Sequence, residues 1–104
     1  ELSVRVEWKG TFEPEKHILG VAIMSSSGDY VFGSNTRNIT LAKPSVSCTI
    51  KLDINPGRYS LLVAVLDRAG KMIDKKELKT AFRVIDDGRE DVGGFARLDY
   101  SYEE

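Results

Sequence analysis

Residues that could support catalysis or metal binding are sparse in this chain of 104 residues. His17 is the only histidine and Cys48 the only cysteine. Metal sites in proteins use three or four ligands, and His17 has no partners at ligand spacing, so we predict a surface or packing role for it. Cys48 shares the apolar face of a predicted strand with Val46 and Ile50, which would bury the thiol that a nucleophile must expose.

A group of acidic residues, Asp86, Asp87, Glu90 and Asp91, lies close together in the sequence. A Ca²⁺ site needs six to eight oxygen ligands around a shaped loop. A glycosidase needs two carboxyl groups across a cleft, one of them with a raised pKa. Because these acids lie in a polar, glycine-bearing loop, we interpret them as solvated charge, with Ca²⁺ binding as the open alternative. The sequence therefore predicts no enzyme and no cofactor.

The composition is that of one ordinary globular domain, which we place at residues 1–104. Fifteen basic and sixteen acidic side chains give a net charge of −1. This balance argues against a nucleic-acid or anionic-membrane surface, which would need a basic excess. With one cysteine no intrachain disulfide can form, so the fold must rest on its core. No apolar run reaches the length of a membrane-spanning helix.

Apolar and polar residues alternate with a period of two along most of the chain, which is typical of half-buried strands. Turn residues such as Ser27-Gly28-Asp29 and Asn55-Pro56-Gly57 separate these runs. We predict about eight strands and an immunoglobulin-like antiparallel β-sandwich, an all-β fold. A polar strand at 72–78 is predicted to lie at an edge, where its lysines discourage unwanted pairing. The predicted strands cover residues 2–9, 18–24, 30–32, 46–54, 59–66, 72–78, 81–85 and 95–102.

Several short motifs resemble one known family. They include the Ile18–Thr36 hairpin with its ending Val31-Phe32-Gly33-Ser34-Asn35-Thr36, the Asn55–Leu61 turn and strand, and the closing strand from Gly94 to Tyr102. Glu1-Leu2 and Ala81–Val84 are similar to further strands of that family. The family is the C-terminal carbohydrate-binding domain of Wzt, the ATPase subunit of ABC transporters that export O-antigen polysaccharide.

The chain also departs from the family pattern. Tyr102 stands where the family often has Trp. The family domain has a further strand before the position of Glu1, so the resemblance implies that this strand was trimmed or comes from elsewhere, for example a partner chain. The phosphate-binding loop of the ATPase half does not occur in the sequence.

The resemblance implies a function and a set of partners. The domain would bind bacterial O-polysaccharide and do no chemistry itself. It would act with the ATPase and transmembrane subunits of an ABC exporter, in the cytoplasm at the inner membrane. Family members dimerise through this domain, in some cases with strand exchange, so a homodimer is expected.

A glycan site needs an exposed aromatic ring for stacking and polar side chains that bind hydroxyl groups. We expect the strands around residues 18–24, 82–84 and 95–102 to be neighbours in one sheet. Alternation then predicts an outer face for carbohydrate binding that carries Met24, Arg83, Phe95, Arg97 and Asp99. Trp8 is a second candidate platform, although it shares the parity of core residues in its strand.

Two other functions remain open from the sequence. The domain could be a carbohydrate-binding appendage of a glycosyltransferase, which the sequence preceding Glu1 would reveal. It could also be a structural or protein-binding sandwich, which predicts no affinity for glycans. The fold alone does not decide among these functions.

Overall fold

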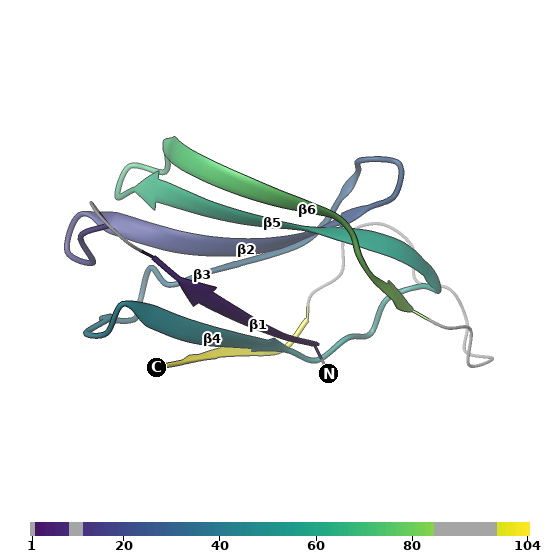
Figure 1. The fold of residues 1–104 in the computed structure, drawn as a ribbon, viewed down its shortest axis with the longest axis horizontal. Coiled ribbons are helices and arrows are strands. Elements are labelled where there is room, and N and C mark those ends of the chain that lie inside the picture. Colours follow the sequence, from purple (N-terminus) through teal and green to yellow (C-terminus); the bar gives the residue numbers. More distant parts are fainter. Residues whose placement is uncertain (1, 9–11, 85–97) are drawn as a thin grey trace.

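The computed structural model describes residues 2–8, 12–84 and 98–104, and within these ranges the chain forms seven strands and no helix. A three-stranded antiparallel sheet has the order β1-β4-β7, and a four-stranded one has the order β3-β2-β5-β6 (Figure 1). The described residues contain no helix long and apolar enough to cross a membrane. The strands are β1 (Leu2–Glu7), β2 (His17–Ser25), β3 (Tyr30–Asn35), β4 (Ser45–Ile50), β5 (Gly57–Asp67), β6 (Met72–Val84) and β7 (Tyr100–Glu103).

The two sheets bury their apolar faces against each other. Val21 and Ile23 of β2, and Cys48 and Ile50 of β4, are all 0% exposed and belong to one core cluster. Burying a Val or Ile side chain stabilises the fold by about 1.5–3 kcal/mol. The predicted immunoglobulin-like antiparallel sandwich is thus confirmed, as is the burial of Cys48.

Two of the predicted strands, at 72–78 and 81–85, belong to a single strand. Strand β6 runs through both 72–78 and the following short segment, and it lies at the edge of its sheet as predicted. Its register against β5 shifts between Tyr59 and Leu61, which pair with Phe82 and Leu78. Four residues of β6 therefore span the same length of the sheet as two residues of β5. A bulge takes up the extra residues, so the chain continues without a turn.

The expected neighbourhood of three strands was also wrong. Strand β7 pairs with β4 in the three-stranded sheet, while β2 and β6 belong to the other sheet with β5 between them. Alternation shows which residues of one strand share a face, but it carries no information about which strands pair.

A buried polar contact joins the two sheets. Ser34 of β3 donates a hydrogen bond to the carbonyl oxygen of Val21 at 2.9 Å, and its Oγ lies 2.8 Å from the hydroxyl of Tyr102 on β7. Since the only Ser34 hydroxyl proton goes to Val21, Tyr102 is the donor to Ser34. Burial raises the pKa of Tyr102, and it also raises the pKa of the Cys48 thiol, 3.8 Å from Ser34 Oγ.

The raised pKa of Tyr102 predicts a loss of stability at alkaline pH. The folded state holds the neutral phenol, whereas the unfolded chain ionises near the ordinary value of 10. Stability is therefore complete below that value and falls as pH rises from it toward the folded-state pKa. Tyr102→Phe should cost about 1 kcal/mol at neutral pH through the lost hydrogen bond. Because it removes this ionisation, its deficit relative to wild type should shrink above about pH 10.

Urea unfolding of both proteins at neutral and alkaline pH measures this difference. A deficit that stays constant across the range would show that Tyr102 ionises as readily in the folded protein as in the unfolded chain.

Candidate functional site

A pocket of about 330 Å³ lies at one end of the four-stranded sheet. Its lining comes from the β2–β3 turn (Ser25–Gly28), from β5 (Arg58, Tyr59 and Ser60) and from β6 (Glu77). Tyr59 belongs to the core cluster between the sheets. Because neighbours along a strand point to opposite faces, Arg58 and Ser60 project from the outer face of this sheet.

The turn that forms one wall of the pocket is held by its own hydrogen bonds. The Ser25 and Gly28 amides donate to the carbonyl oxygens of Asp29 and Ser25, at 2.8 and 3.0 Å. The Asp29 amide donates to Ser25 Oγ and the Ser27 hydroxyl donates to the Asp29 carboxylate, both at 3.0 Å. Gly28 has a φ of 89°, a conformation that glycine adopts without strain. The turn is thus closed on itself, and the Asp29 charge is engaged within it.

Other polar groups of the pocket are available to a ligand. The side chains of Arg58, Glu77 and Ser26 are exposed, and none makes a hydrogen bond or ion pair with another residue that the structure describes. Together they offer a guanidinium donor, a carboxylate acceptor and a hydroxyl that does both. This set suits a ligand with several hydroxyl groups.

Tyr59 supports the pocket from beneath. Its hydroxyl donates to the Asn55 carbonyl oxygen, and its ring stacks on Phe82 with centroids 5.4 Å apart. The ring is 7% exposed. Tyr59 is thus a structural residue that ties its own loop.

An aromatic side chain lies beside the pocket on the same face. Tyr30 of β3 is 49% exposed and pairs with Met24 of β2. A Cβ on Gly33 would lie 1.5 Å from the Tyr30 hydroxyl oxygen, so the end of this ring occupies the space that the missing side chain leaves. A register shift between Ile23 and Met24 allows Tyr30 and Gly33, three residues apart, to share the outer face.

Tyr30 and the pocket form one continuous surface. Met24 pairs with Tyr30 on one side and with Ser60 of β5 on the other. Adjacent strands are about 4.8 Å apart, so two strand spacings place Tyr30 about 10 Å from Ser60. We call this surface, formed by Tyr30, Met24 and the pocket, the outer-face site.

A family model describes nearly the whole chain. It is the Wzt C-terminal domain, and it matches residues 1–98. The chain belongs to this family. Wzt is the ATPase subunit of an ABC transporter, so the family assigns this domain to the C-terminal part of such a subunit. No curated protein and no solved structure matches the chain significantly.

The residues predicted to bind glycan in this Wzt C-terminal domain do not all come together. Met24 lies between Tyr30 and Ser60, and Arg83 pairs with Arg58, so both belong to the outer face of the four-stranded sheet. Asp99 is exposed but directly precedes β7 of the other sheet. Phe95 and Arg97 lie outside the described residues. The binding role of all five stays a prediction.

Sequence reasoning missed Tyr30, Arg58, Ser60 and Glu77. The signal for Arg58 and Ser60 was present, since both alternate with Tyr59 and Leu61, which the sequence placed in a strand core. Tyr30 could not be placed, because a bulge changes which face a residue occupies and alternation assumes none. Glu77 could be placed beside the pocket only from the pairing of β6 with β5.

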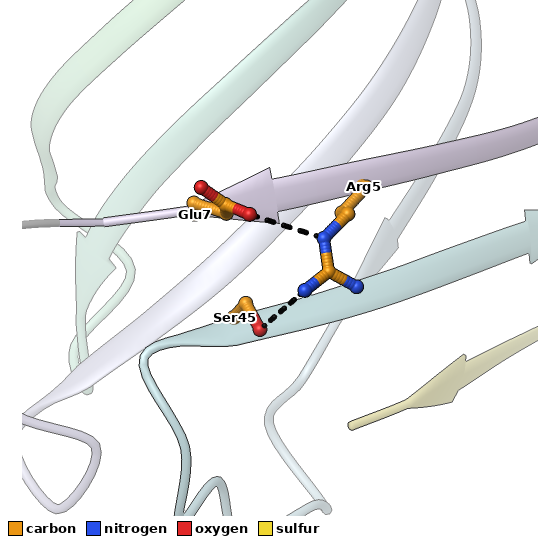
Figure 2. A network of polar contacts seen from close by, with 3 residues as sticks. All are labelled: Arg5, Glu7 and Ser45. Atoms are coloured by element: carbon orange, nitrogen blue, oxygen red, sulfur yellow. Dashed lines mark hydrogen bonds and ion pairs between the residues drawn. The ribbon is translucent and has the colours of Figure 1, made fainter.

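The outer face of the three-stranded sheet contrasts with this site. Arg5 of β1 donates from Nε to Glu7 and from Nη2 to Ser45, both at 3.1 Å (Figure 2). The side chains of Arg5 and Glu7 are both more than 60% exposed, so their ion pair contributes little to stability. Its geometry nevertheless satisfies the guanidinium within the protein, whereas Arg58 has no such partner among the residues described.

The remaining candidates from the sequence have structural positions. His17 Nδ1 accepts a hydrogen bond from the Glu13 amide at 2.9 Å and so closes the turn before β2. Trp8 is half-buried and packs against a small cluster of Leu19, Leu41 and Val46. No group of three metal-ligating side chains occurs in the described ranges, and the acidic loop at 86–91 lies outside them.

The contact between Tyr30 and Gly33 predicts a mild effect from Gly33→Ala. The new methyl group would displace the Tyr30 ring, but this side chain is half-exposed and able to rotate away. We expect a loss of less than about 1 kcal/mol in the free energy of unfolding. NMR should show a clear change in the Tyr30 ring resonances.

Gly28→Ala is the matched control. Nothing lies within 4 Å of its added Cβ, but its φ of 89° strains any other residue. That strain should cost about 1–2 kcal/mol and leave the Tyr30 resonances in place. A greater loss from Gly33→Ala than from Gly28→Ala would mean that the Tyr30 ring is locked in position.

Proposed function

We propose that this domain binds bacterial O-antigen-type polysaccharide, without catalysis, as the substrate-recognition domain of an ABC exporter. The observation that carries the proposal is the half-exposed Tyr30 ring beside a polar pocket on one sheet face. Membership of the Wzt C-terminal domain family supports the setting in an exporter.

The chemistry of the outer-face site suits a sugar. A pyranose ring presents apolar C–H groups that pack on aromatic side chains such as the half-exposed Tyr30. Its hydroxyl groups need donors and acceptors, which Arg58, Glu77 and Ser26 supply from three separate segments. Affinity should be modest, because every hydroxyl taken out of water must find a replacement hydrogen bond.

Binding without hydrolysis is the proposed activity. The lining of the described pocket contains one carboxylate, Glu77, whereas glycoside hydrolysis commonly uses a pair of carboxyl groups about 5–9.5 Å apart. Asp29 is close in sequence, but its carboxylate accepts the Ser27 hydroxyl within the turn. We therefore propose that the domain is not an enzyme and uses no cofactor.

In the exporter, the domain would deliver the glycan to the transmembrane subunits and couple its recognition to the ATPase. This work would take place in the cytoplasm at the inner membrane. We propose a homodimer, with or without strand exchange. Light scattering that gives twice the chain mass supports the dimer, and the mass of a single chain at high concentration refutes it.

Glycan binding can be tested by NMR titration with purified O-polysaccharides, including that of the host. Tyr30→Ala should weaken binding about tenfold, since an aromatic contact contributes on the order of 1 kcal/mol beyond its buried area. Tyr100→Ala is the control on β7 of the other sheet, where Tyr100 is 44% exposed. Because the Tyr100 ring also contacts Phe32 and Tyr102, this variant is first shown to be folded. Shifts should cluster at Tyr30, Met24 and Arg58.

Two results would count against this proposal in different ways. Shifts centred on Asp99 and Tyr100 would keep the function and move the site to the three-stranded sheet. An absence of shifts with every glycan, from a folded domain at millimolar repeat units, would favour a structural or protein-binding role.

A further inference from the structure

Two arginines lie opposite each other at the edge of the outer-face site. Arg58 of β5 pairs with Arg83 of β6, and both are exposed. The next pair along the strands, Tyr59 and Phe82, stacks at 5.4 Å on the core side. The arginine pair therefore projects from the outer face, with Cβ atoms about 5 Å apart.

Among the residues that the structure describes, this arrangement is unfavourable. Like charges directly opposite on neighbouring strands destabilise a sheet. Neither guanidinium has an ion-pair partner in the part of the chain that the structure describes, where the recorded pairs are Arg5–Glu7 and Lys16–Glu13. Arg5 shows the ordinary solution, in which a carboxylate and a hydroxyl of the same sheet engage the guanidinium.

Glu77 does not resolve the conflict. It lines the pocket with Arg58, but the two form no ion pair within 4 Å. One carboxylate would in any case leave a positive excess beside the two arginines.

We propose that the outer-face site selects glycans that carry an anionic substituent, which binds between Arg58 and Arg83. The inference rests on the proposed glycan-binding function and specifies its substrate class. The shared chemistry is an oxyanion, either the carboxylate of an acidic sugar or a phosphate monoester. Each guanidinium presents a planar fork of N–H donors that matches such a group with two parallel hydrogen bonds. The bound anion also removes the repulsion between the two arginines.

The test uses the O-polysaccharides that bind, each before and after its charge is removed. Carboxyl reduction converts an acidic sugar to a neutral one, and phosphatase treatment removes a phosphate monoester. We expect the untreated polymer to bind about tenfold more tightly than the treated one, as a charge-assisted hydrogen bond implies. The treatment that weakens binding identifies the carboxylate or the phosphate as the source of the charge.

Arg58→Gln and Arg83→Gln should each remove most of the preference for the charged polymer. Arg5→Gln is the control, because it makes the same charge change on the other sheet and should leave that preference intact. Added salt should weaken binding of the charged polymer more than that of its neutral form.

The outcomes separate the two proposals. Equal affinity of the wild-type domain for charged and neutral polymers overturns the anion preference and leaves glycan binding in place. The same conclusion follows if Arg58→Gln and Arg83→Gln weaken the binding of charged and neutral polymers equally. If no polysaccharide binds the folded domain, glycan binding itself fails. A preference that survives both substitutions also overturns the assignment to this arginine pair.

Discussion

Burial of one face of β5 against the opposite sheet is the constraint on which the rest of the structure depends. Tyr59 and Leu61 must point into the core, where both are less than 10% exposed. Because side chains alternate, Arg58 and Ser60 are thereby directed to the outer face. Strand β5 also lies between β2 and β6, so it brings residues from both neighbours to the same surface. The polar pocket is thus a direct consequence of the way that the core is packed.

The second element of the site depends on a local irregularity. Without the register shift between Ile23 and Met24, Tyr30 and Gly33 would lie on opposite faces of β3. The shift brings both to the outer face, and the missing side chain at Gly33 makes room for the Tyr30 hydroxyl. This glycine therefore has a steric role, since its φ lies outside the positive range that Gly28 adopts. Bulges are common where a sheet must redirect a side chain toward a functional surface.

The two outer faces of the sandwich differ in how their polar groups are satisfied. On the three-stranded sheet, Arg5 has protein partners in Glu7 and Ser45. On the four-stranded sheet, Arg58 lines a pocket and has no such partner among the described residues. A rigid turn with internal hydrogen bonds forms the wall of that pocket, so little ordering is needed when a ligand binds. This asymmetry is the reason that we propose the four-stranded sheet as the recognition face.

The sequence by itself determined the all-β class, most strand positions, the family and the core role of Cys48. These follow from local alternation and short motifs, which the chain encodes within a few residues. Tertiary structure alone decided that β7 belongs to the other sheet, so that Asp99 is separated from Met24 and Arg83. Strand pairing depends on contacts between distant segments, and a bulge reverses the face of every residue beyond it. For the same reason Tyr30, and the meeting of Arg58 with Arg83, became visible only in the folded sheet.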